Sequence, residues 1–257
     1  MRPLAEFDRL SVVLVNTRNP LNIGAAARAM SNFGFRDLRL VNPFEPSFRE
    51  ARSAVGASAT ELLAGAREYP SVADAVGDCN LVIGTTAAAR RELQHPLRSL
   101  GEAETTNLIR RKLSRGRIAL LFGSEKRGLS NEDFSHCHWL LRIPTREGQG
   151  SMNLGQAVAV CLYEIARISS RPGKAKGGAR AAAKPGKGSP ATVAETERIT
   201  TLLLEALRGS GYLAARPASS ADERVRRMVR RLDLSSSDAQ VWLGMLRQIA
   251  WKINKFG

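Results

Sequence analysis

Three short segments rich in glycine, alanine and asparagine constrain the fold of this chain most, because each follows directly after an apolar run. They cover residues 16–28, 122–130 and 143–154. The runs before the first two, residues 11–15 and 118–122, are compact and aliphatic, as in buried parallel strands. Small side chains and flexible backbone at the carboxyl ends of parallel strands mark the edge of an open sheet where ligands bind. Three such segments in order predict an α/β domain with a ligand site at that edge.

Expected strands and helices follow one another around these segments. The strands cover residues 11–15, 38–41, 81–84, 118–122 and 139–143. The helices cover residues 23–33, 58–66, 103–114 and 154–168. Asn22 is expected to cap the first helix and Gly34 to end it, since amide side chains favour helix starts and glycine favours helix ends. The sequence therefore predicts a parallel sheet packed against helices over residues 1–170.

The rest of the chain is expected to form a linker and a helical extension. Residues 171–192 are rich in Gly, Pro, Ala and Lys and hold no acidic residue, which is typical of a flexible basic linker. Residues 193–257 are expected to form a small all-helical extension, with helices over 193–207 and 221–232 and a third after the cap at 235–238. The third helix carries an apolar stripe of Val241, Met245, Leu246, Ile249 and Ile253.

The net charge of +15 indicates a polyanionic partner, because attraction to phosphates raises both encounter rate and affinity. A solvated basic surface without a partner is the alternative. The charge gathers in one predicted helix, whose arginines are Arg224, Arg226, Arg227, Arg230 and Arg231. Five guanidiniums in eight positions repel one another unless a partner is present, so we expect this helix to contact RNA. A solvated helix face is the alternative.

Cysteines and histidines give no sign of a metal site. Cys79, Cys137 and Cys161 are odd in number and lie in apolar runs, as reduced core thiols do. The cluster at 136–138 lacks a second ligand pair with zinc spacing, so no metal is expected. The chain also lacks an apolar stretch long enough for a signal peptide or a membrane span. We therefore expect a cytoplasmic protein without a membrane partner.

The common nucleotide-binding motifs do not account for the three segments. The first lacks the G-x-G-x-x-G pattern, and no Gly-Lys-Ser/Thr follows any predicted strand. The chain instead contains three patterns in order: Asn22-x-Gly24-Ala25-x-x-Arg28-Ala29-Met30, then Phe122-Gly123-x-Glu125-x-x-Gly128-Leu129, then Ser151-Met152-Asn153-Leu154. Together they resemble the three motifs of the SPOUT (TrmH/SpoU) superfamily of RNA 2′-O-methyltransferases. The resemblance covers residues 10–168 and is closest to the TrmJ branch.

This resemblance implies a fold, a cofactor and an assembly. The fold is a parallel-sheet SPOUT fold whose carboxyl-terminal part is tied in a trefoil knot, an exception to the rule against threaded chains. The cofactor is S-adenosyl-L-methionine, and the assembly is a homodimer. By motif, the cofactor-binding residues are Thr85, Thr86, Ala87, Gly123, Ile143, Gly150, Ser151 and Met152. Taken singly, such residues also fit a turn, a helix cap or the core.

Arg28 is the catalytic residue that the resemblance implies. A guanidinium stays charged in proteins and makes a poor base. We therefore expect Arg28 to hold the substrate phosphate and to stabilise the developing ribose alkoxide, while a phosphate oxygen or water takes the proton. A surface helix arginine is the alternative. Asn22, Glu125 and Asn153 are expected to support the site or the substrate, although helix capping alone also explains Asn153.

The expected activity is 2′-O-methylation of tRNA, at cytidine or uridine 32 of the anticodon loop by resemblance to the TrmJ branch. Ribosomal RNA is an alternative substrate, because the SpoU branch shares all three motifs. A catalytically silent RNA-binding protein is a second alternative, which the intact Arg28 and second motif disfavour. A methyltransferase acting on small molecules fits the basic charge poorly.

Overall fold

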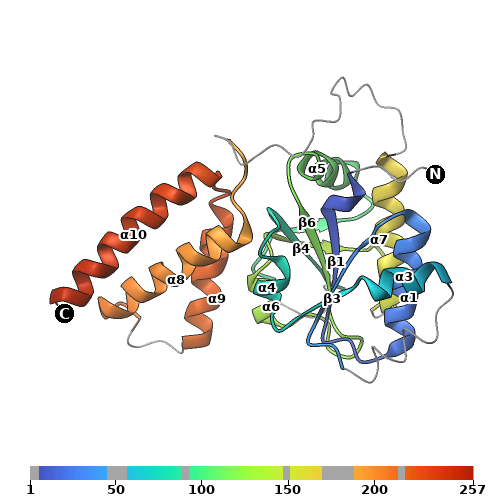
Figure 1. The fold of residues 1–257 in the computed structure, drawn as a ribbon, viewed down its shortest axis with the longest axis horizontal. Coiled ribbons are helices and arrows are strands. Elements are labelled where there is room, and N and C mark those ends of the chain that lie inside the picture. The colour runs from blue at the N-terminus through green and yellow to red at the C-terminus, as the bar shows by residue number, and fades with distance from the viewer. Residues whose placement is uncertain are drawn as a thin grey trace.

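The protein forms an α/β domain and a separate helical lobe (Figure 1). The computed structural model describes residues 6–44, 57–87, 93–146, 151–169, 188–213 and 218–256. The domain contains a seven-stranded sheet in the order β3-β2-β1-β6-β4-β7-β5, and its strand pairs are parallel. The strands are β1 (Leu10–Val15), β2 (Asp37–Val41), β3 (Arg67–Tyr69), β4 (Leu81–Thr85), β5 (Leu97–Ser99), β6 (Ile118–Phe122) and β7 (Trp139–Arg142). The five predicted strands are confirmed, and the expected α/β parallel sheet is correct.

The sequence did not predict the two edge strands, β3 and β5. Each has three residues, and neither carries a continuous apolar run. Arg67 and Glu68 are exposed, as is Leu97. Strands at a sheet edge need little burial, so their sequences lack the signal that marks the central strands.

Helices cover both faces of the sheet, because successive strand residues point to opposite faces. Val12 and Leu14 belong to the core beneath α1 (Pro20–Phe33), α3 (Ala57–Ala64), α5 (Ala103–Leu113) and α7 (Leu154–Ser169). Val13 and Val15 belong to the core beneath α4 (Val72–Val76) and α6 (Asn131–Ser135). Figure 1 shows α1, α3 and α7 on one side of the sheet and α4 and α6 on the other. A 3-10 turn, η1 (Phe7–Arg9), precedes β1.

The start of α1 corrects one expectation. Asn19, and not Asn22, caps this helix, with its side-chain oxygen accepting a hydrogen bond of 3.0 Å from the Leu21 amide. Pro20 occupies the first helical position, where its fixed φ favours the helix and its missing N–H costs little. Asn22 therefore lies inside the first turn and makes other contacts. Gly34 ends the helix in the left-handed conformation, at φ 82°, as expected.

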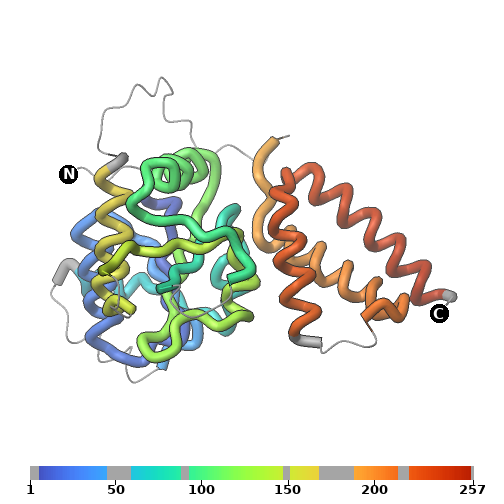
Figure 2. The backbone as a smooth tube through the Cα atoms, turned by 180° about the vertical axis from the view of Figure 1, so that it is seen from behind, coloured from blue at the N-terminus to red at the C-terminus, as the bar shows by residue number. Residues whose placement is uncertain are grey.

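Three helices form the carboxyl-terminal lobe, as expected: α8 (Val193–Gly209), α9 (Ala218–Arg231) and α10 (Ser236–Phe256). Figure 2 shows them beside the α/β domain. Leu243 and Leu246 of α10 are buried in the core of the lobe, together with Ile199 of α8. The apolar stripe seen in the sequence is only partly buried, because Val241 and Ile249 are 60% and 48% exposed.

Hydrogen bonds to backbone carbonyls fix the lobe to the α/β domain where α8 begins. The amide of Val193 donates to the Cys79 carbonyl at 2.8 Å, and the Asn80 side chain donates to the Pro190 carbonyl at 2.9 Å. Thr192 and Glu195 form a capping box at the first turn of α8. The predicted linker lies mostly outside the described residues, and its last residues, 188–192, are held in place by this attachment and by the segment before α10.

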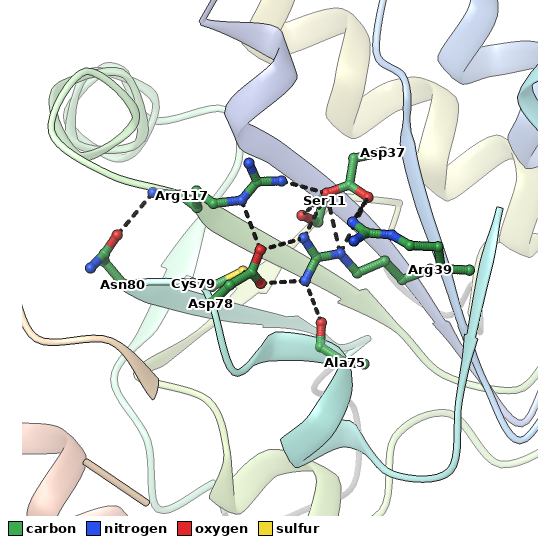
Figure 3. A network of polar contacts seen from close by, with 9 residues as sticks. Ser11, Asp37, Arg39, Ala75, Asp78, Cys79, Asn80 and Arg117 are labelled. Carbon is green, nitrogen blue, oxygen red and sulfur yellow. Dashed lines mark hydrogen bonds and ion pairs between the residues drawn. The ribbon is translucent and has the colours of Figure 1, made fainter. Parts of the chain in front are cut away.

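An ionic network around the buried Arg39 supports the amino ends of the strands near this attachment (Figure 3). Arg39 is 1% exposed and pairs with Asp37 at 2.7 Å and with Asp78 at 2.5 Å. Arg117 donates to Asp37 at 2.7 Å, and its amide donates to the Asn80 side chain at 3.0 Å. Burial raises the pKa of Asp37, but hydrogen bonds from Arg39 and its other donors outweigh that effect and hold the pKa well below its ordinary value.

Candidate functional site

The three glycine- and asparagine-rich segments meet at the carboxyl edge of the sheet, as predicted. β6 lies between β1 and β4, and β7 lies next to β4. The Thr85 hydroxyl donates to the Leu121 carbonyl at 2.8 Å, and the Thr86 amide donates to the Leu141 carbonyl at 3.0 Å. These bonds join the ends of β4, β6 and β7 and leave Ala87 exposed at the rim.

A chain of side-chain hydrogen bonds connects all three segments. The Asn153 amide donates to the Asn22 side-chain oxygen at 2.9 Å, and the Asn22 amide donates to Glu125 at 2.8 Å. Asn22 is 7% exposed, so both of its polar groups are satisfied by protein atoms. Glu125 also accepts from the backbone amide of Asn19. The expected supporting residues Asn22, Glu125 and Asn153 therefore act together in fixing the shape of this edge.

Asn153 also caps α7. Its side-chain oxygen accepts a hydrogen bond of 3.3 Å from the amide of Gln156. The cap that sequence reasoning offered for Asn153 is therefore present, and the same side chain reaches Asn22 through its nitrogen. Capping and site support do not exclude one another here.

Gly123 is required by a close approach of two backbone segments. A Cβ atom at this position would lie 2.0 Å from the carbonyl carbon of Gly128 and 2.2 Å from the amide nitrogen of Leu129. The Gly128 amide donates to the Ser124 carbonyl at 2.8 Å and closes the turn, with Gly128 itself at φ +67°. The loop after β6 therefore folds back on itself and presents backbone groups at the sheet edge.

The remaining predicted cofactor residues lie at the ends of β7 and before α7. Ile143 is half-buried against the main core, and Met152 is half-buried as well. Ser151 is exposed. Gly150 lies outside the described residues. The half-buried Ile143 and Met152 offer the apolar contact that a planar ring needs.

Arg28 lies on the exposed surface of α1. Within the described part of the chain, its guanidinium has no carboxylate within ion-pair distance. α1 packs closely on α7 nearby, since a Cβ added at Gly155 would lie 2.5 Å from the Cβ of Ala25. The charge of Arg28 is thus available to a ligand, on a helix held firmly by its neighbour.

Arginines of α9 fall into two groups. Arg226 donates to Glu197 at 2.9 Å and to the Ser135 hydroxyl at 2.8 Å. Arg230 is 3% exposed and also pairs with Glu197, at 2.9 Å. Glu197 of α8 thus supplies counter-charge for two arginines that the sequence analysis assigned to RNA. The sequence did not reveal this role, because a single acidic residue on another helix forms no recognisable pattern. Arg224, Arg227 and Arg231 line a groove beside Gln94.

Cys79, Cys137 and Cys161 are buried and free, as expected. Burial raises the pKa of the Cys161 thiol to about 12, so it stays protonated. Burial and nearby arginines lower the pKa of His136 to about 3. Within the ranges that the structure describes, no cluster of three metal-ligating side chains occurs. In those same ranges, no helix has the length and apolar character to cross a membrane.

Comparison with known proteins places these features in a family. The model of the SpoU rRNA methylase family matches residues 9–163. The tRNA (cytidine/uridine/adenosine-2′-O-)-methyltransferase TrmJ of Pseudomonas aeruginosa is 35% identical over 251 residues, which cover 94% of each chain. The TrmJ of Sodalis glossinidius, named a tRNA (cytidine/uridine-2′-O-)-methyltransferase, is 31% identical over 95% of this chain and 92% of its own.

Among solved structures, the crystal structure of TrmJ from Z. mobilis ZM4 matches with a TM-score of 0.75 and 30% identity, over 93% of this chain and 98% of that one. A probable methylase family protein from Haemophilus influenzae matches with a TM-score of 0.54 and 27% identity, over 98% and 100% of the two chains. These matches extend beyond the α/β domain into the helical lobe.

Proposed function

The chain belongs to the SpoU rRNA methylase family, as its motifs predicted, and from that premise we propose that it methylates ribose 2′-hydroxyls of tRNA. The observation that carries the proposal is the hydrogen-bonded chain from Asn153 through Asn22 to Glu125, which joins the three family motifs into one site. Relatives that align along nearly the whole chain are named tRNA 2′-O-methyltransferases. The protein is thus an RNA 2′-O-methyltransferase, and tRNA is the substrate class that those relatives support.

S-adenosyl-L-methionine is the methyl donor in this proposal, and the residues at the sheet edge fit it. Ile143 and Met152 offer half-buried apolar contact to an adenine ring. The turn at Gly123 and the backbone at 85–87 offer peptide groups to the polar edges of the nucleoside. The family motif adds Ser151 to the proposed pocket, together with Gly150, which lies outside the described residues. When bound, the donor supplies an electrophilic methyl group on a sulfonium centre.

Arg28 is the proposed catalytic residue. Its exposed guanidinium presents several N–H donors in a planar fork, which matches the oxygens of a phosphate. Arg28 holds the phosphate next to the target ribose and stabilises the negative charge that develops on the 2′-oxygen. The 2′ proton passes to a phosphate oxygen or a water molecule, because an arginine does not accept it.

We propose cytidine or uridine 32 of the anticodon loop as the target, and the cytoplasm as the site of action. The active form in this proposal is a homodimer with a trefoil knot, as in the family that the motifs resemble. The basic charge of the chain supports binding of a polyanion, with Arg224, Arg227 and Arg231 of α9 as RNA contacts.

The test is methyl transfer to RNA from labelled S-adenosyl-L-methionine. The purified protein is incubated with unmodified total tRNA and, separately, with ribosomal RNA, and 2′-O-methyl marks are mapped as nuclease-resistant dinucleotides. A mark at position 32 of tRNA is expected. Transfer only to ribosomal RNA would overturn the substrate, and transfer to neither would leave a catalytically silent RNA-binding protein.

A further inference from the structure

Helix α9 presents two sets of arginines with different surroundings. Arg226 and Arg230 point to Glu197 and take part in attaching the helix. Arg224, Arg227 and Arg231 follow one another at spacings of three and four residues, which places them along one face of the helix. Glu197 compensates the charge of the first set, whereas the second set does not contact that carboxylate.

The second set lines a groove between α9 and the α/β domain. This groove has a volume of about 430 Å³, and Gln94 forms its opposite wall, with Ser220 and Ala221 at the first turns of α9. The guanidinium of Arg227 donates to the Gln94 side-chain oxygen at 2.6 Å and faces Glu223 at 3.5 Å. Among the described residues, Arg224 and Arg231 have no carboxylate within 4.0 Å. Three guanidiniums thus line the groove, and only that of Arg227 pairs with a carboxylate.

The electrostatic effect of these arginines reaches beyond the groove. His95 lies next to Gln94, and its pKa is lowered to about 4 by burial and by the charges of Arg227 and Arg231. Burial is the larger cause, and the positive charges of the groove add to it, so the His95 imidazole is less easily protonated. Guanidiniums gathered in one place repel one another, and a bound anion reduces that repulsion.

We propose that this groove binds a backbone phosphate of the RNA whose ribose is methylated. The inference rests on the proposed function for the identity of the RNA. Arg224 and Arg231 are exposed and lie about one helical turn before and after Arg227 on α9. The planar fork of a guanidinium suits the two free oxygens of a phosphodiester. In Figures 1 and 2 the first turn of α9 lies at the same end of the molecule as the start of α1, which follows the carboxyl end of β1.

Gln94 gives the groove its link to the α/β domain. It lies on the segment between β4 and β5, shortly after the proposed cofactor residues 85–87. Because Gln94 bonds to Arg227, the groove exists only when α9 is attached to the α/β domain. RNA bound there spans the two parts of the protein.

The experiment compares the double variant R224Q/R231Q with the single variants R224Q and R247Q. Arg247 is exposed on α10 and lines a different groove, so R247Q removes one charge without touching the proposed site and is the matched control for R224Q. Affinity for tRNA is measured by fluorescence anisotropy between about 50 and 300 mM salt. We expect the double variant to reduce the slope of log affinity against log salt by about 1 to 2 units, with roughly tenfold weaker binding at the lowest salt. R247Q is expected to change the slope less than R224Q does.

Equal effects of R224Q and R247Q would show that only net charge matters and would overturn the proposal. An unchanged slope in the double variant would overturn it as well. If inorganic phosphate raises the melting temperature of the natural protein but not of the double variant, while the RNA slope stays the same, the groove binds small anions and not RNA. Failure of the proposed function gives a different result, because the natural protein would then bind RNA but transfer no methyl groups to it. Circular dichroism confirms that the variants keep their helices.

Discussion

Asn22 connects the three loops of the candidate site because its amide accepts one hydrogen bond and donates another. The Asn22 side-chain oxygen accepts a hydrogen bond from the Asn153 amide, and the Asn22 side-chain nitrogen donates to Glu125 at 2.8 Å. An aspartate in its place keeps the shape and the acceptor but loses the donor, and it sets a second carboxylate against Glu125. We therefore expect N22D to lower the free energy of unfolding by about 1–3 kcal/mol and to slow methyl transfer.

Urea unfolding of N22D, E125Q and the double variant N22D/E125Q measures this coupling. In the double variant a glutamine at position 125 donates to the new carboxylate, so part of the lost stability returns. Strictly additive effects of the two substitutions would contradict a direct link between these side chains.

At Arg28, a lysine substitution tests whether the positive charge alone or the planar shape of the guanidinium matters. Lysine keeps the positive charge but presents a point charge and not a planar fork. We expect R28K to reduce turnover by about 10- to 1,000-fold, because removal of one stabilising donor has effects of that order. The melting temperature stays unchanged, because Arg28 is exposed and unpaired within the described ranges. The matched control is R36K on the exposed Arg36, just after α1; nearly full turnover in R28K would rule out bidentate positioning.

At the scale of elements, the loop after β6 depends on the absence of a side chain at Gly123. A Cβ there meets backbone atoms 2.0 Å and 2.2 Å away, which do not move as a flexible side chain does. We expect G123A to lower the free energy of unfolding by about 1–3 kcal/mol or more and to weaken binding of S-adenosyl-L-methionine.

Gly244 offers the control for this substitution. It lies within α10, and an added Cβ there has nothing within 4 Å. G244A is expected to stabilise the protein by up to about 1 kcal/mol, since alanine favours helix over glycine. Calorimetry and titration with the cofactor compare both variants, and normal cofactor affinity in G123A would remove this loop from the proposed pocket.

How much the sequence predicts differs between elements. The central strands and the long helices carry strong apolar patterns, and these were predicted within a few residues. Three-residue edge strands such as β3 carry no such pattern. Asn19 and Asn22 offer the same chemistry as helix caps, and only Pro20 between them favours Asn19. The role of Glu197 depends on how two helices pack, so the number of guanidiniums in α9 overstated the charge left for RNA.

For the whole molecule, buried ionisable groups determine how stability depends on pH. Burial lowers the pKa of His136 and of His138 to about 3, whereas an unfolded histidine titrates near 6.5. Below about pH 6.5 the unfolded chain therefore binds more protons than the folded one, and stability falls as pH decreases towards the folded pKa. Asp37 acts in the same direction at lower pH. Its pKa is held below the ordinary aspartate value of 3.8, so its contribution is present above that value and is lost as pH falls further.

We therefore expect the free energy of unfolding to decline in two stages, first below about pH 6.5 and then more steeply below about pH 4. Chemical denaturation at a series of pH values measures the decline. The variant D37N leaves Arg39 and Arg117 without their shared carboxylate and is less stable at neutral pH. It keeps the histidine stage and loses part of the second one, because the titrating group is gone. If the free energy of unfolding of D37N falls below pH 4 in parallel with that of the natural protein, other carboxylates cause the second decline. The ionic network around Arg39 would then not explain it.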